Sequence, residues 1–471
     1  MSVIRLLREV NKMDKFFERY QYLWHPLFHH VLDTLNCYAL VLYRAYNNKD
    51  NGITEEQYEV LRASKDFNVM LEFLNDCYEG KYETIHKGQT TLKELLEVFK
   101  PLQINCNDGL VLFKYANFIA LDELGMFGAD FWNLYDGLYR ECRSVVIDIV
   151  NTCIVLAPQA KFFNVNENDE WSYDNIKDKI SKAKSVEITN KLDGSNQNYR
   201  WYNGEVVGSG SSAINKNESW RLQKGYSLLT LSHRIMMQDY QDYTFMYEFI
   251  SPDNQVVVNY TKEQEGLYLF GMRNVKTGKE LTYTEVLKIA SEYDVPTTEL
   301  YQDSFDDIMG QLDNYSSNEK EGWVIGIVDE YNNIFKAKLK VNDYVLMHKA
   351  LAKLISPNAI IKAIADGKWD DFYSKIPMAY RENANNIKAT VMKYINHMAY
   401  KVGEYCKRAV EELGETRNDR KTFMIWCNTN IPKDYRGYVI SRYNGREINF
   451  LTKNSNGYKK LNELIVKEEV E

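Results

Sequence analysis

The sequence predicts an α+β protein in which an antiparallel-sheet domain lies between a helical N-terminal extension and an all-helical C-terminal domain. Short alternating runs of β-branched and aromatic residues occupy the middle of the chain, and one pair of runs is joined by Asn203-Gly204, the strongest short hairpin signal. Apolar side chains recur at helical spacing before and after this region. A chain of 471 residues is long enough for several domains. We expect three, at residues 1–105, 106–345 and 346–471.

The N-terminal extension carries two runs with one apolar helical face each. The residues on these faces are Val3, Leu6, Leu7 and Val10 in the first run and Leu92, Leu95, Leu96 and Phe99 in the second. The block contains no motif that carries chemistry. Its pattern indicates an added domain or a cap that binds a partner.

The middle domain is predicted to be rich in short strands. The expected strands are residues 110–118, 143–150, 153–157, 185–191, 197–202, 205–209, 244–250, 255–260, 267–270, 321–328 and 334–341, with helices at 283–293 and 305–312. Several strands carry a charged residue at a margin, where it is available for chemistry.

The C-terminal quarter is helical and basic. Val391, Ile395, Met398, Val402, Tyr405 and Ala409 are spaced 4, 3, 4, 3 and 4, which predicts an amphipathic helix. From residue 346 onward there are 22 Lys and Arg against 15 Asp and Glu, although the whole chain has a net charge of −8. A local basic surface of this kind is what phosphate backbones select, and a solvated surface without a partner is the alternative.

The cysteines and the apolar runs exclude other classes. The seven cysteines are scattered and form no Cys-x-x-Cys pair, which argues against a disulfide framework or a zinc ribbon and favours a reducing cytosol. No signal-peptide pattern and no run of about 18 apolar residues is found, so we expect a cytoplasmic protein without membrane segments.

The stretch Ser185–Ser195 points to covalent chemistry. Its β-branched run ends in Lys191, followed by an Asp193-Gly194 turn, so the lysine lies at a strand end beside a sheet. A lysine that attacks the α-phosphorus of a nucleotide must first be neutral. Because a free lysine titrates near 10.4, being half neutral near pH 7.5 requires a shift of about three units. We expect neighbouring cations and partial burial to supply it.

Other residues suit the remaining needs of such a reaction. Lys336, Lys338 and Lys340 alternate with apolar residues, so they share one strand face; an edge strand defended by lysines is the alternative. We expect Lys338 and Lys340 to stabilise the transferred phosphoryl group, and Arg143 and Lys161 to stabilise the leaving pyrophosphate. Glu248 is expected to accept ribose hydroxyl protons, and Phe163 to stack on adenine. Glu321 and Asp193 are expected to hold Mg²⁺, which Mn²⁺ can replace. A single strand glutamate more often points to solvent, but the set together favours chemistry.

In these motifs the sequence resembles the covalent nucleotidyltransferases, and within them the bacteriophage RNA ligase 1 family. The matching segments are Lys191–Ser195, Tyr247–Asn254, Glu321–Val324, Lys338–Lys340 with Tyr344 and His348, Glu141–Arg143, Lys161–Glu167, Phe113–Tyr115 and Asp419–Phe423. The resemblance implies a nucleotidyltransferase (ATP-grasp-like) sheet domain and cofactor contacts from Tyr115, Arg143, Lys161, Phe163, Gly194, Glu248, Lys338 and Lys340.

The resemblance also implies a reaction and partners. It implies an ATP-dependent ligase, expected as a monomer, that adenylates Lys191, passes AMP to an RNA 5′-phosphate and seals that end to a 3′-hydroxyl, as in the repair of cleaved tRNA in a host cytoplasm. One departure concerns Val206–Ser212, which has no lysine where the family usually has some. A guanylyltransferase or DNA ligase of the same superfamily and an RNA-binding relative without catalysis are the alternatives.

Overall fold

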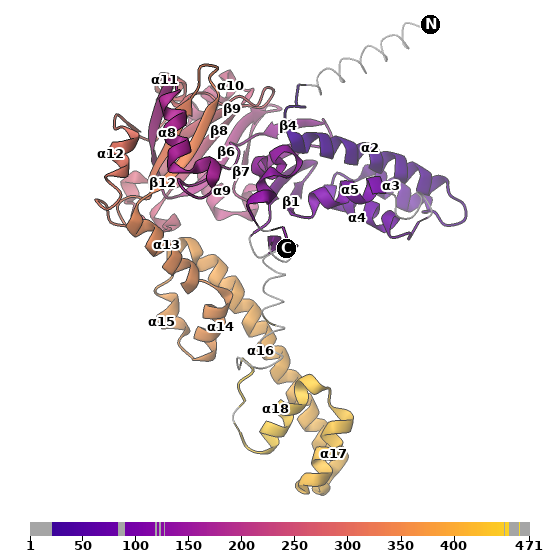
Figure 1. The fold of residues 1–471 in the computed structure, drawn as a ribbon. Coiled ribbons are helices and arrows are strands. Elements are labelled where there is room, and N and C mark those ends of the chain that lie inside the picture. Colours follow the sequence, from indigo (N-terminus) through magenta and orange to yellow (C-terminus); the bar gives the residue numbers. More distant parts are fainter. Residues whose placement is uncertain are drawn as a thin grey trace. The chain divides into compact units, whose positions relative to one another are not determined.

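The computed structural model describes residues 21–82, 90–117, 120–121, 124–126, 128–446, 448–451 and 461. The chain divides into two compact units, Met1–Tyr344 and Val345–Glu471. All described strands belong to the first unit, and the described elements of the second are helices (Figure 1). No described helix combines the length and the apolar character needed to span a membrane. The seven cysteines are free thiols, as expected.

Four helices precede the first strand: α2 (Pro26–Asn47), α3 (Glu55–Ala63), α4 (Phe67–Tyr78) and α5 (Thr90–Phe99). They belong to the first unit, because Phe67 at the start of α4 contacts both Phe99 of α5 and Phe113 of the first sheet edge to face. The predicted helix at Leu92–Phe99 is confirmed as α5. The predicted face of Val3, Leu6, Leu7 and Val10 lies outside the described residues.

The first sheet contains β1 (Leu102–Asn107), β2 (Leu110–Tyr115), β3 (Arg143–Asp148) and β4 (Cys153–Leu156), paired antiparallel in that order. The sequence did not predict β1, and the helical extension was expected to continue to residue 105. β1 turns into β2 through Asp108-Gly109, whose φ angles are +46° and +87°, as a two-residue hairpin turn requires. β1 was missed because it is mostly polar, with little of the β-branched character that marks strands.

Two further antiparallel sheets complete the first unit. One has the order β10-β5-β11-β12 and the other β7-β6-β8-β9. Their bounds are β5 Ser185–Lys191, β6 Ser195–Tyr202, β7 Glu205–Ser209, β8 Tyr243–Ile250, β9 Gly266–Asn274, β10 Leu300–Tyr301, β11 Gly322–Val328 and β12 Ile334–Lys340. The predicted hairpin at Asn203-Gly204 is confirmed between β6 and β7. The α+β class with antiparallel sheets is therefore confirmed.

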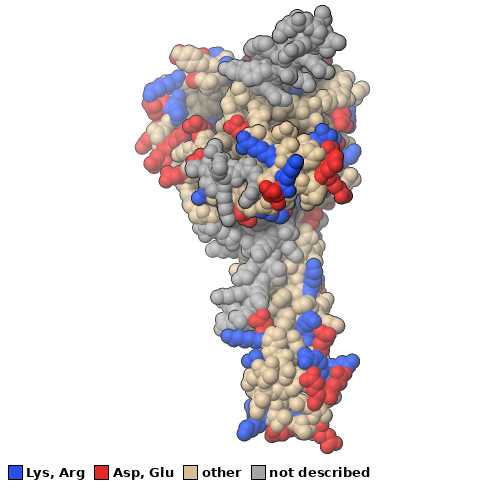
Figure 2. All heavy atoms as spheres, turned by 90° about the vertical axis from the view of Figure 1, so that its right-hand side faces the viewer, with Lys and Arg blue, Asp and Glu red and all other residues tan. Residues whose placement is uncertain are grey.

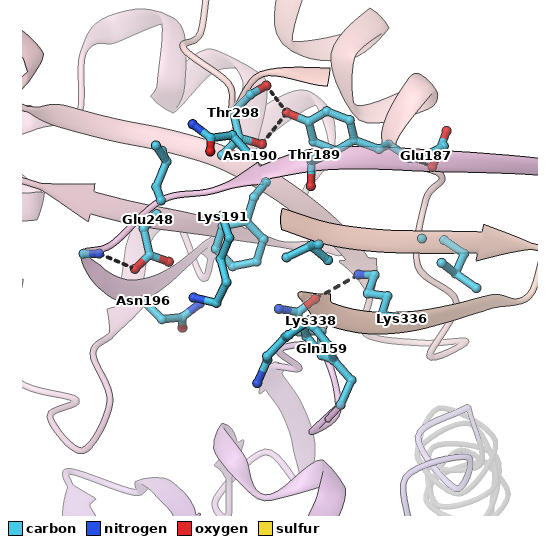
Figure 3. Close-up of a pocket in the computed structure, with 18 of the residues that line it drawn as sticks. Gln159, Glu187, Thr189, Asn190, Lys191, Asn196, Glu248, Thr298, Lys336 and Lys338 are labelled. Carbon is cyan, nitrogen blue, oxygen red and sulfur yellow. Dashed lines mark hydrogen bonds between the residues drawn. The ribbon is translucent and has the colours of Figure 1, made fainter. Parts of the chain in front are cut away.

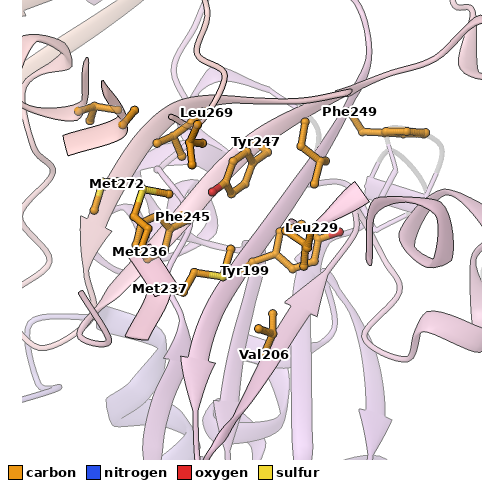
Figure 4. Packing of buried hydrophobic residues seen from close by; sticks show 14 of the residues in the cluster. Tyr199, Val206, Leu229, Met236, Met237, Phe245, Tyr247, Phe249, Leu269 and Met272 are labelled. Atoms are coloured by element: carbon orange, nitrogen blue, oxygen red, sulfur yellow. The ribbon is translucent and has the colours of Figure 1, made fainter. Parts of the chain in front are cut away.

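One face of the β7-β6-β8-β9 sheet forms the main core with the helices packed on it (Figure 4). Phe245, Tyr247 and Phe249 of β8 point into this core at alternate positions. Each large apolar side chain buried here contributes roughly 1.5–3 kcal/mol. The same alternation turns Glu248 to the opposite face of the sheet, away from the core.

The remaining described elements of the first unit are short. They are α7 Leu138–Glu141, α8 Tyr173–Ser181, α9 Trp220–Leu228, α10 Leu231–Asp239, α11 Tyr283–Glu292 and α12 Phe305–Met309, with 3₁₀ segments η1 Ala129–Gly137, η2 Asp169–Trp171, η3 Lys216–Glu218, η4 Pro252–Asn254 and η5 Lys262–Gln264. The predicted helices at 283–293 and 305–312 are confirmed as α11 and α12. The predicted strand at 255–260 is wrong, because this segment gives backbone N–H groups to a buried carboxylate and not to a strand partner.

The second unit is built around one long helix. α16 (Met378–Leu413) carries the predicted apolar stripe, which enters two separate cores. The other helices are α13 Asn342–Leu354, which crosses the boundary between the units, α14 Pro357–Ala365, α15 Trp369–Tyr373, α17 Arg420–Asn430 and α18 Lys433–Tyr443, with the 3₁₀ segment η6 Gly414–Asn418. On the face drawn in Figure 2, basic side chains of this unit alternate with acidic ones. Ion pairs such as Lys407–Glu411 show the same mixing.

Candidate active site

A cavity of about 360 Å³ lies against one face of the β5-β11-β12 sheet (Figure 3). Three alternate rungs of the sheet, whose side chains share one face, form its floor. Each rung places one residue of β5 opposite one of β11 and one of β12: Glu187–Gly326–Lys336, Thr189–Val324–Lys338 and Lys191–Gly322–Lys340. The alternation of β12 therefore brings the three predicted lysines to one face, and all three line the cavity.

Lys191 ends β5 and is held by a buried carboxylate. Its Nζ lies 2.8 Å from Glu321 Oε2, and Lys340 Nζ lies 2.9 Å from Glu321 Oε1. Glu321 comes directly before β11, between the ends of β5 and β12, and only 4% of its side chain is exposed. Gly322 permits this close passage: its φ is +152°, and a Cβ would lie 2.0 Å from the Leu339 carbonyl oxygen. Three of the predicted catalytic residues thus form one ionic chain.

The charge state of Lys191 differs from the expectation. Burial disfavours its ammonium form, but the carboxylates of Glu321, Glu248 and Asp193 outweigh burial and raise the pKa of Lys191. The sequence predicted a lowered pKa because it showed the neighbouring lysines and not the distance to each carboxylate. Lys338 instead has a lowered pKa: burial, and then Arg143 and other cations, hold it well below the usual value.

Glu248 enters the cavity from β8. Its Oε1 accepts a hydrogen bond of 3.1 Å from the Gly194 N–H. A side chain at position 194 would not fit, since a Cβ there would lie 2.3 Å from the Phe249 carbonyl oxygen. Burial, reinforced by the Glu321 carboxylate and opposed by Lys191, raises the pKa of Glu248 to about 8. At neutral pH this group is therefore largely a neutral carboxylic acid that can donate as well as accept.

We expect Glu248→Gln to flatten the dependence of stability on pH. Between about pH 4.5 and 8, Glu248 keeps its proton in the folded protein but has lost it in the unfolded chain. The free energy of unfolding of the wild type should therefore fall, by on the order of a few kcal/mol, as the pH rises through this window. Glutamine keeps the bond from Gly194 without the charge. Urea unfolding at pH 5, 6, 7 and 8 measures the slope.

Glu330→Gln is the matched control, because Glu330 is an exposed glutamate in the turn after β11. Its slope should equal that of the wild type. An undiminished slope in Glu248→Gln would show that Glu248 is already ionised in the folded protein at pH 5.

Asp193 does not lie where a metal ligand would. Its Oδ1 accepts a 2.8 Å bond from the Tyr344 hydroxyl, and its Oδ2 accepts 2.8 Å bonds from the N–H groups of Val257 and Val258. Only 4% of the residue is exposed. The carboxylate therefore anchors the turn after Lys191, and the metal role assigned to Asp193 stays a prediction.

The described residues contain no group of three or more His, Cys, Asp or Glu able to hold a metal ion. The remaining predicted ligand, Glu321, is occupied by two lysines. In the described residues, Asp193 and Glu321 therefore do not form a preformed magnesium site.

Arg143 and Phe162 reach the cavity from the segment before β5. Arg143 lines it, as predicted, and Phe162 lines it next to Lys338, whose Nζ is 4.5 Å from the ring centre. Phe163, which the sequence analysis assigned to adenine, is buried against Trp132 and Trp171 and does not line the cavity. The structure therefore places the neighbouring aromatic residue at the cavity. Both rings fit the sequence argument, and only the local backbone decides between them.

Lys161 and Tyr115 lie beside the cavity and not on its wall. The Lys161 ammonium is 4.6 Å from the Trp132 ring centre, 4.9 Å from that of Phe163 and 5.6 Å from that of Tyr115. Burial lowers the pKa of Lys161, and Arg143 lowers it further. The pyrophosphate contact assigned to Lys161 stays a prediction.

An apolar part of the cavity was missed by the sequence analysis. It is lined by the apolar side chains Phe270, Leu281, Val324 and Ile334 and by Tyr283 and Thr298. The Tyr283 hydroxyl bonds the Thr298 backbone and hydroxyl. These residues are ordinary core types, so no sequence signal separates them from the rest of the core. The cavity thus combines apolar side chains with lysines on all three rungs of its floor.

Comparisons with known proteins identify the domain that holds this cavity. The family model for RNA ligases matches residues 141–344. A protein of Autographa californica nuclear polyhedrosis virus, provisionally named a bifunctional polynucleotide kinase/RNA ligase, is 24% identical over an alignment of 276 residues. That alignment covers 54% of this chain and 36% of the viral protein, so the chain spans about a third of the relative it matches.

Two solved structures are similar at low identity. An archaeal ATP-dependent RNA ligase is 15% identical with a TM-score of 0.37, over 58% of this chain and 65% of that one. A Naegleria gruberi RNA ligase with pyrophosphate is 18% identical with a TM-score of 0.29, over 37% of this chain and 55% of that one. The family match spans the segment with Lys191, Glu248, Glu321, Lys338 and Lys340. Residues 141–344 of this chain therefore match the RNA ligase family, over less than half of the chain.

Proposed function

We propose that the chain is an ATP-dependent RNA ligase that works through a Lys191–AMP intermediate. One observation carries the proposal: Lys191, Glu321 and Lys340 form a single ionic chain at a cavity whose lining also includes apolar side chains. A nucleotide has the same two parts, a flat base and charged phosphates. Its α-phosphate would lie at the lysine when the base packs against the apolar side chains.

In the first step, Lys191 Nζ attacks the α-phosphorus of ATP, a P–N bond forms, and the P–O bond to pyrophosphate breaks. Nζ must first lose a proton, because its pKa is raised in the free protein. Glu321 Oε2, 2.8 Å away, is the nearest base. An anionic triphosphate favours the ammonium form of Lys338, whose pKa is lowered without it. Lys338 and Lys340 then stabilise the charge on the transferred phosphoryl group.

Two transfers complete the reaction. An oxygen of an RNA 5′-phosphate attacks the lysyl-AMP phosphorus, the P–N bond breaks, and Lys191 takes up a proton. A 3′-hydroxyl then attacks the 5′-phosphorus, a phosphodiester forms, and AMP leaves. We propose nicked tRNA as the substrate, since the C-terminal quarter has seven more basic than acidic residues.

The test is incubation of the full chain with magnesium and α-labelled ATP or GTP, followed by denaturing electrophoresis. We expect label to remain on the protein with ATP and to be released by acid, which cleaves a P–N bond. Labelling by GTP alone would point to a capping guanylyltransferase, and no label with either nucleotide would overturn the proposal. Joining of a nicked tRNA by the labelled protein tests the substrate.

A further inference from the structure

A second, smaller cavity of about 90 Å³ adjoins the one that holds Lys191. Arg143 and Asn196 line both cavities. The other residues around the smaller one are Lys114, Tyr115, Ser144 and Ser211. It has room for several water molecules or one tetrahedral anion. Every side chain that lines it is polar.

Two cations meet at this cavity without an acidic partner. Lys114 on β2 and Arg143 on β3 lie opposite each other in the antiparallel ladder, so their side chains are neighbours on one face. Within the described residues neither makes an ion pair, and Arg143 Nη1 is buried without a hydrogen-bond partner. Burial and the nearby guanidinium lower the pKa of Lys114. Two adjacent half-buried cations repel each other, and an anion between them would offset the repulsion.

The loop after β7 closes the same cavity. Ser144 Oγ donates a 2.6 Å hydrogen bond to the Ser211 carbonyl, and Asn105 Nδ2 donates a 3.0 Å bond to that of Ser212. The end of β7 and this loop, residues Val206–Ser212, contain no lysine. Val206 packs in the main core and Ser209 is fully buried, so neither position presents a cation here. The positive charge comes instead from β2, through Lys114.

We propose that Lys114 and Arg143 form a phosphoryl-binding subsite next to Lys191. The inference rests on the proposed function, which supplies two sources of that chemistry: the pyrophosphate portion of ATP and the 5′-phosphate of RNA. In either case Lys114 is a binding residue that β2 supplies.

The primary test is calorimetric titration of inorganic pyrophosphate into the full chain and into Lys114→Met, which keeps most of the side-chain length and removes the charge. A hydrogen bond between charged groups corresponds to about a 10- to 100-fold change in affinity, and we expect Lys114→Met to weaken pyrophosphate by this factor. Lys114→Arg, which restores a cation, should bind within about threefold of the wild type. Unchanged affinity in Lys114→Met would overturn the subsite.

Lys184→Met is the matched control. Lys184 is an exposed lysine just before β5, at the end of that strand opposite Lys191, and its Nζ contacts the Asn332 side chain. This variant should bind pyrophosphate as the wild type does. If both variants lost affinity, the anion would be attracted by the overall positive charge of the protein surface and not bound by the cavity.

Kinetics separate the two sources. If the subsite holds the pyrophosphate portion of ATP, Lys114→Met raises the KM for ATP in lysine adenylation and leaves the sealing of pre-adenylated RNA unchanged. If it holds the RNA end, adenylation is normal and AMP transfer to 5′-phosphorylated RNA slows. A chain that binds pyrophosphate through Lys114 but never labels with ATP would refute the proposed function and keep the subsite.

Discussion

Lys191→Arg is expected to abolish labelling by ATP while the chain stays folded. Arginine keeps a positive charge opposite Glu321, so the buried carboxylate at 2.8 Å keeps its partner. A guanidinium is never neutral near physiological pH and cannot attack phosphorus. Removing a nucleophile typically costs more than about 10³-fold in rate. Thermal unfolding and labelling of the same preparation measure both properties, with Lys184→Arg as the control that should label normally.

The pH dependence of labelling gives the same prediction a second readout. Because the carboxylates raise the pKa of Lys191, only a small fraction of the side chain is neutral at pH 7. The rate of adduct formation by the wild type should therefore increase with pH from 6 to 9, by up to about tenfold per pH unit. A rate independent of pH, or an adduct that persists in Lys191→Arg, would place the nucleophile elsewhere.

The sequence predicted the sheet domain well wherever strands follow the alternating pattern. The hairpin at Asn203-Gly204, the Lys191 strand and the lysine-bearing strand are all present with nearly the predicted bounds. The prediction fails where backbone N–H groups donate to a side chain and not to a neighbouring strand. Residues 255–260 have the alternation of a strand, yet Val257 and Val258 give their N–H groups to Asp193. Such a contact joins positions 64 and 65 residues apart, and no local pattern records it.

The candidate site was predicted by residue type and less well by role. Strand periodicity places Lys338 and Lys340 on the face of Lys191, which is why these lysines line one cavity. Whether a carboxylate faces a metal, a lysine or a backbone amide depends on distances of a few ångströms between strands. Lys114 shows the same limit: it reaches the cavity because β2 pairs with β3, and nothing in its own neighbourhood of the sequence indicates it.

Asp193→Ala should lower the free energy of unfolding by about 3–5 kcal/mol, since it leaves three buried donors without their acceptor. These donors are the N–H groups of Val257 and Val258 and the Tyr344 hydroxyl. Asp193→Asn should keep most of the stability. Its carbonyl oxygen can still accept both N–H groups, and its amide can donate to the Tyr344 oxygen, which accepts as well as donates. Urea unfolding of the three proteins measures the difference.

Asp329→Ala is the matched control for the loss of an anchoring carboxylate. Asp329 Oδ1 likewise accepts two backbone N–H groups, from Tyr331 at 2.9 Å and Asn333 at 2.7 Å, but in an exposed turn. Water can replace the carboxylate there, so the expected cost is about 1 kcal/mol or less.

The asparagine variant also separates anchoring from metal binding. A metal ligand needs the negative charge of the carboxylate. If Asp193 were a metal ligand, Asp193→Asn would need about 10- to 100-fold more magnesium for half-maximal labelling, and its stability would change little. An anchor needs only acceptors in the right places. Because both carboxylate oxygens already bond protein donors, we expect an unchanged magnesium requirement in Asp193→Asn and a large loss of stability only in Asp193→Ala.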